Sequence, residues 1–145
     1  MSGAIVSHKP DANAATMAFM ARWMPRSEHA TVAAMVRRGE EREYFRTLMW
    51  KQKQAIEAMP KMRATESVED PTVGLHYFKG GCDWHITEAW EEDGEIMAFG
   101  LANLGYGGDL GYISITELVQ HGVELDLHFR PVPLSTVREK EGAVS

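Results

Sequence analysis

The sequence predicts an α+β fold in which N-terminal helices pack on a four- to five-stranded, mainly antiparallel sheet, with a short helix before the last strand. Two observations lead to this prediction. Residues 11–60 place apolar side chains at helical steps of three and four, whereas residues 74–133 alternate polar and apolar side chains and break at glycines. Residues 61–73, between these two parts, have the polar composition of a linker or exposed loop.

One domain is the expectation for a chain of this size. A length of 145 residues is typical of a single domain, and a 44% share of hydrophobic residues suffices for one compact core. We assign residues 1–133 to this domain, with a helical extension over 11–60, a linker over 61–73 and a sheet core over 74–133. Residues 134–145 are polar and are expected to form a flexible tail.

The sequence also indicates the cellular compartment of the protein. The sequence contains no run of about eighteen apolar residues that could cross a bilayer, and residues 1–21 lack the continuous apolar stretch of a signal peptide. Cys82 is the only cysteine, so an intramolecular disulfide cannot form, which fits a reducing compartment. We therefore expect a cytoplasmic protein that does not insert into a membrane.

Three helices are expected in the N-terminal half. The first runs from Asp11 to Trp23 and ends before Pro25. The second runs from Ser27 to Arg38, with the serine as its N-cap and two arginines in its last turn. The third, from Glu40 to Met59, has one apolar and one charged face and is closed by Pro60. These end signals agree with the periodicity of the apolar residues.

Five strands are expected in the C-terminal half, near residues 74–78, 83–90, 95–102, 111–113 and 123–129. Lys79 to Gly81 marks the first turn, and Asp93-Gly94 is a strong signal for a tight hairpin between the second and third strands. Ser114 and Glu117 match a capping box, which predicts a short helix over residues 115–121. The glycine-rich loop over residues 105–111 lacks the context of a phosphate-binding loop and is expected to need positive backbone angles.

The net charge of −6 argues against nonspecific attraction to nucleic acid or anionic lipid. Many of the lysines and arginines lie within residues 22–63, whereas residues 88–93 and 109–126 are acidic. We therefore expect a protein partner, no direct binding of nucleic acid through the sheet, and an acidic binding surface. The candidate binding residues are Glu88, Glu91, Glu92, Asp93, Glu124 and Asp126.

A second interpretation stays open, because a period of two would place Glu124, Asp126 and His128 on one side of the last strand. In this alternative the protein is a small metal-assisted hydrolase or nucleotide-processing enzyme, with Asp126 and His128 catalytic and with His85, Asp126 and His128 holding a metal. Any antiparallel sheet with one face in solvent also has polar residues at such positions, even when they have no catalytic or metal-binding role. We therefore expect neither a cofactor nor a metal.

The sheet region contains four distinctive short motifs: Trp84-His85-Ile86-Thr87-Glu88, Ala98 to Leu101, Leu110 to Ser114, and Asp126 to Phe129. Thr87 and Glu88 would point to opposite faces of their strand unless a bulge intervenes. Together the motifs resemble the DUF2958 family over roughly residues 75–133. The resemblance implies a mobile-element setting, on plasmids or phages of bacteria, and a fold unit without catalytic roles. We therefore expect a non-enzymatic accessory or interaction protein that acts on a host or defence protein.

Overall fold

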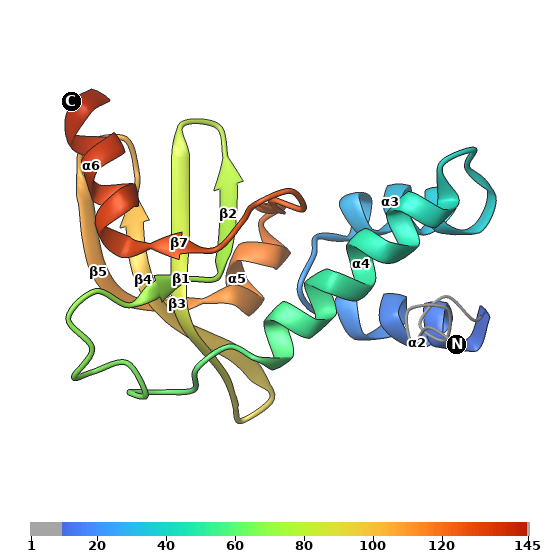
Figure 1. Ribbon diagram of the computed structural model, residues 1–145, viewed down its shortest axis with the longest axis horizontal. Helices are drawn as coiled ribbons and strands as arrows, with labels where there is room; N and C mark the ends of the chain where they lie inside the picture. Colours follow the sequence, from blue (N-terminus) through green and yellow to red (C-terminus); the bar gives the residue numbers. More distant parts are fainter. Residues whose placement is uncertain (1–9, 145) are drawn as a thin grey trace.

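The computed structural model describes residues 10–144, with side chains over residues 13–141. Three helices form its N-terminal part: α2 (Pro10–Met20), α3 (Arg26–Arg38) and α4 (Arg42–Glu57). They lie together at one end of the molecule, and the C-terminal half of the chain forms the sheet at the other end (Figure 1). Helix α3 begins one residue earlier than expected, with Pro25 at its N-cap, so the predicted capping role of Ser27 is wrong.

The main sheet confirms the predicted fold class. Its order is β5-β4-β3-β2-β6, and every pairing is antiparallel. The short helix α5 (Ile115–Gln120) precedes the last of these strands, as expected. The strands are β2 (Leu75–Lys79), β3 (Cys82–Glu92), β4 (Glu95–Asn103), β5 (Gly108–Ser114) and β6 (Glu124–Leu125). A separate two-stranded sheet pairs β1 (Thr72–Val73) with β7 (Val132–Pro133).

The local turn and cap signals are confirmed. Asp93 and Gly94 have φ angles of 53° and 82°, and positive angles at both central positions are what the type I′ turn of a two-residue hairpin requires. Gly105 and Gly107 have φ angles of 104° and 103°, so the glycine loop is used for backbone conformation. The amide of Glu117 donates to Oγ of Ser114 at 3.1 Å, which caps α5.

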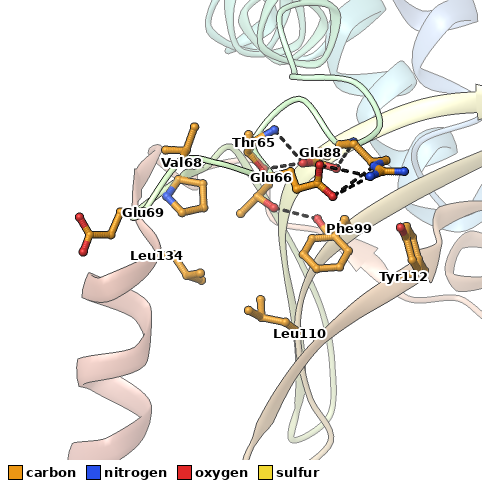
Figure 2. Close-up of a pocket in the computed structure, with 12 residues that line it drawn as sticks. Thr65, Glu66, Val68, Glu69, Glu88, Phe99, Leu110, Tyr112 and Leu134 are labelled. Atoms are coloured by element: carbon orange, nitrogen blue, oxygen red, sulfur yellow. Dashed lines mark hydrogen bonds and ion pairs between the residues drawn. The ribbon is translucent and has the colours of Figure 1, made fainter.

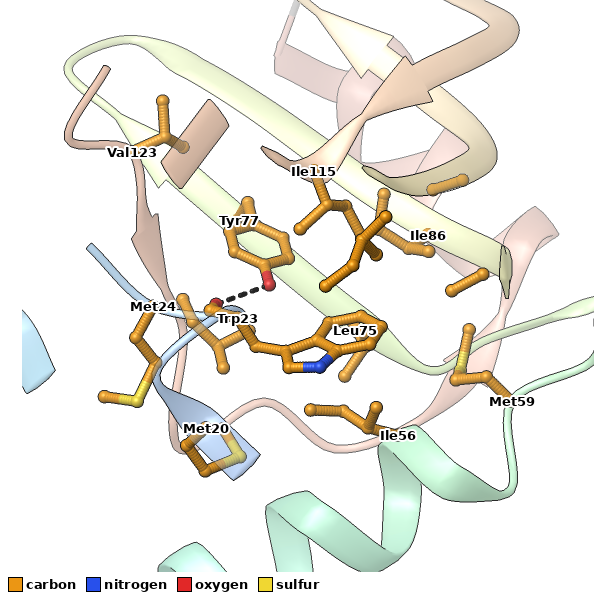
Figure 3. Close-up of a cluster of buried hydrophobic side chains, with 14 of the residues drawn as sticks. Met20, Trp23, Met24, Ile56, Met59, Leu75, Tyr77, Ile86, Ile115 and Val123 are labelled. Atoms are coloured by element: carbon orange, nitrogen blue, oxygen red, sulfur yellow. Dashed lines mark hydrogen bonds between the residues drawn. The ribbon is translucent and has the colours of Figure 1, made fainter. Parts of the chain in front are cut away.

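The main core fills the space between the helices and one face of the sheet, here called the helix face. Its side chains come from all three N-terminal helices and from β2, β3 and β4, and Figure 3 shows part of this cluster. Tyr77 lies at its centre, fully buried, and its hydroxyl donates to the carbonyl of Trp23 at 2.6 Å. This hydrogen bond satisfies a phenol that would otherwise be costly to bury.

A smaller core covers part of the opposite face of the sheet, here called the open face. Val73 and Leu101 pack there against Leu134 and Val137 of helix α6 (Leu134–Val144). The expectation of a flexible tail over residues 134–145 is therefore wrong for the described part of that segment, while residue 145 lies outside it. The carboxylate of Asp70 accepts from both the amide and the hydroxyl of Ser135, at 2.9 and 2.7 Å, in the first turn of α6.

The last predicted strand is much shorter than expected. Regular pairing covers only Glu124 and Leu125, and the chain turns at Asp126. Oδ1 of Asp126 accepts from the amide of His128 at 3.1 Å, a local hydrogen bond typical of turns that begin with aspartate. The expected alternation therefore ends at Leu125 and does not extend to Phe129.

Candidate functional site

A β-bulge in the centre of β3 gives the open face its shape. The register between β3 and β4 shifts between Ile86 and Glu88, and Oγ1 of Thr87 donates to the carbonyl of Phe99 at 3.1 Å. Gly100 lies opposite this bulge, where a Cβ atom would overlap the carbonyl oxygen of His85. Because of the bulge, Thr87 and Glu88 both face the same cavity instead of opposite sides of the sheet.

Glu88 anchors the loop over residues 61–71 to the sheet. Only 4% of the residue is exposed, and its carboxylate accepts from the amides of Arg63 and Thr65, at 2.8 and 2.9 Å, and from the hydroxyl of Thr65. Burial opposes ionisation of this carboxyl group, but the hydrogen bonds outweigh it and lower its pKa. Glu88 is therefore not available to an acidic binding surface, contrary to the expectation from the sequence.

The anchored loop forms one wall of a cavity of about 310 Å³ on the open face (Figure 2). Strands β4 and β5 supply its apolar floor through Phe99, Leu110 and Tyr112, and Leu134 of α6 closes another side. The loop contributes Val68 and an ion pair between Arg63 and Glu66. Tyr112 is 61% exposed and Leu110 is 44% exposed, so large apolar groups at this site remain open to solvent.

An aromatic row continues from the cavity to the β3–β4 hairpin. The rings of Phe99 and Tyr112 meet edge to face at 5.4 Å, and those of Tyr112 and Trp90 do so at 6.1 Å. Nε1 of Trp90 donates to the carboxylate of Glu92 at 3.0 Å. The apolar cavity and the acidic hairpin therefore form one continuous surface.

The hairpin itself carries three of the predicted binding residues, Glu91, Glu92 and Asp93, all of which are exposed. Glu91 forms an ion pair with Arg22, whose second guanidinium nitrogen donates to the carbonyl of Gly94 at 3.1 Å. This arginine ties the hairpin to the segment after α2. Among the described residues, Glu91 is the hairpin carboxylate that has an ion-pair partner, so Glu92 and Asp93 keep a negative charge facing solvent.

The remaining two predicted binding residues lie elsewhere. Glu124 pairs with Phe78 of β2, and Phe78 pairs on its other side with Asp83 of β3. Asp83 lies near the end of β3 that is far from the hairpin. Asp83 and Glu91 are eight residues apart on this strand, which corresponds to roughly 26 Å at the usual rise per residue. Glu124 and Asp126 therefore do not share a surface with the acidic hairpin.

Asp126 interacts with a residue that the sequence analysis did not select. Nδ1 of His76 lies 2.9 Å from its Oδ2, and Nε2 of His76 lies 2.7 Å from Oδ1 of Asp83. The ring of His85 stacks on that of His76 with centroids 4.5 Å apart. Nδ1 of His85 is buried and has no hydrogen-bond partner among the described residues. Burial, followed by the nearby His76, lowers the pKa of His85 to about 4.

The residues of the alternative metal site do not converge. Nε2 of His128 lies 2.9 Å from the hydroxyl of Tyr44 on α4, whereas His85 and Asp126 contact His76. Within the described part of the chain, no group of three or more His, Cys, Asp or Glu side chains is arranged to hold a metal ion. Asp126 and His128 share only the bond from the backbone amide of His128.

The apolar residues of the cavity were not predicted from the sequence, although the apolar side chains on both faces of two strands indicate such a site. Strands β4 and β5 present apolar side chains on both faces, with Phe99 and Tyr112 on one side and Ala98 and Ile113 on the other. A sheet that is apolar on both faces requires a second covering layer or a binding partner. Attention to this second face could have predicted both the cavity and the packing of α6.

Comparisons with known proteins gave a match to a protein family. No curated protein and no solved structure matches the chain. Among the described residues, none of the helices combines the length and the apolar character needed to span a bilayer. The family described as "Protein of unknown function (DUF2958)" matches residues 45–140, a range that includes most of α4 and of α6 as well as the sheet. The chain therefore belongs to the DUF2958 family.

Proposed function

We propose that this protein acts in the cytoplasm as a non-enzymatic accessory protein of a mobile genetic element, and that it binds a protein partner. The binding surface is the cavity beneath the loop over residues 61–71 together with the adjoining acidic hairpin. The observation that carries the proposal is the continuous row from Phe99 through Tyr112 and Trp90 to Glu92. The mobile-element setting rests on the resemblance of the sheet motifs to the family.

The apolar part of this surface suits an anchoring side chain of a protein partner. Aromatic residues that stay exposed around a concave site are typical of the energetic centre of protein interfaces. Tyr112 and Leu110 are open to solvent, while Phe99 completes the apolar floor and Leu134 closes another side of the cavity. A single large apolar side chain of the partner fits a space of about 310 Å³.

The charged part favours a basic partner. Glu92 and Asp93 at the hairpin are exposed, and the cavity wall adds Glu66 and Glu69 against the single positive charge of Arg63. A surface with this excess of negative charge attracts lysine and arginine residues, especially at low ionic strength. A host or defence protein that normally binds nucleic acid has a surface of that kind.

The cavity is better suited to binding than to catalysis. Both carboxylate oxygens of Glu88 accept hydrogen bonds from the loop, and its lowered pKa makes it a weak base. The hydroxyl of Thr65 donates to the same carboxylate, but a carboxylate of lowered pKa accepts a proton poorly and so does little to activate this hydroxyl as a nucleophile. Among the described residues that line the cavity, no histidine or cysteine is present.

Affinity capture from host cells, followed by binding measurements with the purified partner, tests this proposal. We expect Val68→Arg to weaken binding at least tenfold, because Val68 lines the cavity and a basic partner would meet a new positive charge. Leu104→Arg is the matched control, since Leu104 is exposed to a similar extent, 45% against 48% for Val68, but lies outside the cavity. Charge reversal at Glu92 and Asp93 should also weaken binding, and rising salt should do the same for the wild type.

Equal affinities of the two arginine variants would contradict the location of the site. An affinity that changes neither with salt nor with charge reversal at the hairpin would contradict the contribution of charge. Turnover of a substrate that depends on residues of the cavity would contradict the non-enzymatic role.

A further inference from the structure

Strand β5 is an edge of the main sheet that lacks most of the usual protection, although the side chain of Glu141 on α6 reaches its first residue, Gly108. Within the described part of the chain, it pairs with β4 on one side and with no strand on the other. Exposed edges are normally protected by lysine, by proline, by a bulge or by a covering element. Over its seven residues β5 contains neither lysine nor proline, its pairing with β4 shows no register shift, and its single charge is Asp109.

The opposite edge of the sheet shows the contrast. Strand β6 is only two residues long, and the amide of Leu125 donates to the carboxylate of Glu28 on α3 at 3.0 Å. A short strand with a capped amide offers little to an incoming chain. Within the part of the chain that the structure describes, β5 is therefore the one long and open edge of the main sheet.

The exposed apolar side chains of β5 lie on either side of Gly111. Leu110 and Tyr112 flank this glycine, both are exposed, and both lie on the open face. A Cβ atom added at Gly111 would point to the helix face and would meet nothing within 4 Å. Gly111 is also the central residue of the strand from Gly108 to Ser114.

We propose that two copies of this protein associate through antiparallel pairing of their β5 strands, about a two-fold axis at Gly111. This register pairs all seven residues of the strand with those of the second copy. It places each Leu110 directly opposite Tyr112 of the second copy, so that two large apolar side chains lie at the short separation of a cross-strand pair. The two five-stranded sheets become one continuous sheet.

The charge on the strand agrees with this register. Asp109 lies opposite Ile113 of the second copy, so the two copies of the only charged residue do not face each other. The two-fold arrangement uses the same edge of both copies and leaves neither open, so the assembly closes at two chains. The pairing also places Tyr112 of the second copy beside Leu110 at the border of the cavity, which enlarges the apolar site.

Cysteine cross-linking tests the register. In a Cys82→Ser background, Gly111→Cys supplies the only thiol, and the space around residue 111 can accept the side chain. Opposed residues of an antiparallel pair are close enough to form a disulfide. Mild oxidation should therefore convert most of this variant into a covalent dimer. Tyr106→Cys is the matched control, since residue 106 is 84% exposed but lies outside β5 and should cross-link at least tenfold more slowly.

The mass in solution provides the second measurement. Light scattering of the wild type should give twice the 16.2 kDa of one chain, and Tyr112→Lys should give a single chain with an unchanged circular dichroism spectrum. A wild-type protein with the mass of one chain would overturn the proposal. Equal cross-linking at positions 106 and 111, or no cross-linking at 111, would overturn the register.

Discussion

The imidazole ring of His85 lies nearly parallel to that of His76, with an interplanar angle of 7°. The two rings differ in their surroundings, because His76 lies between the carboxylates of Asp83 and Asp126 whereas Nδ1 of His85 is buried without a partner among the described residues. A proton on His85 would add a charge that is poorly solvated and close to a second imidazole. The stack therefore favours a neutral His85.

This stack predicts that the contribution of His85 to the free energy of unfolding falls as the pH drops from about 6.5 to 4. In the unfolded chain His85 takes up a proton at its ordinary pKa of 6.5, but in the folded chain it does so only near 4, so acid favours the unfolded state. The contribution of His85 is roughly 2 kcal/mol across this window after allowance for solvent screening. Urea unfolding at several pH values should show this slope as the difference in unfolding free energy between the wild type and His85→Phe.

Glu28 predicts a slope of the opposite sign. Burial, reinforced by Glu124 and Asp126 and opposed by the amide of Leu125, raises the pKa of Glu28 from 4.5 to about 7. The folded chain therefore holds a proton that the unfolded chain releases, and stability falls as the pH rises from about 4.5 to 7. Glu28→Gln keeps an acceptor for Leu125 and should be more stable than the wild type at pH 8 by roughly 2 kcal/mol, with little difference at pH 4.

Because these two effects oppose each other, the wild type alone gives a shallow pH profile that does not separate them. The single variants separate them, since each removes one of the two titrating groups. A profile of Glu28→Gln that runs parallel to that of the wild type across the whole range would show that Glu28 titrates normally in the folded chain.

Gly100→Ala should destabilise the protein by about 3 kcal/mol or more. A Cβ at this position would overlap the carbonyl oxygen of His85, which is backbone and cannot rotate away, so the bulge opposite Gly100 would have to shift. Gly81→Ala is a suitable control, because a Cβ there meets nothing within 4 Å. Thermal unfolding of both variants measures the difference, and a Gly100→Ala protein as stable as the control would contradict the proposed packing of the bulge.

The sequence predicts the parts of this fold that depend on neighbouring residues. The hairpin at Asp93 and Gly94 and the cap at Ser114 require only residues one to three positions away, and both are confirmed. The bulge at Thr87 depends on Gly100 in the next strand, so no local pattern indicates it. The start of α6 depends on Asp70, which is 65 positions from Ser135.

The candidate site was harder to predict for the same reason. His76 contacts carboxylates that are 7 and 50 positions away in the sequence, and periodicity alone does not indicate which residues of separate strands meet. Glu88 was assigned to an acidic surface because the residues around it are acidic, but a loop more than twenty positions earlier covers it. Charge patterns indicate which residues are polar, whereas tertiary contacts decide which of them are exposed.

Glu88→Gln should release the loop that covers the cavity. The amide would keep one acceptor oxygen but present hydrogens to the donors of Thr65, so the charged hydrogen bonds that hold residues 63–65 would be lost. Trypsin should then cleave after Arg63 roughly tenfold faster, because local opening governs access to an anchored loop. Glu92→Gln removes an exposed charge outside the loop and should leave this rate unchanged. If both variants are cleaved at the wild-type rate, the carboxylate of Glu88 does not hold the loop in place.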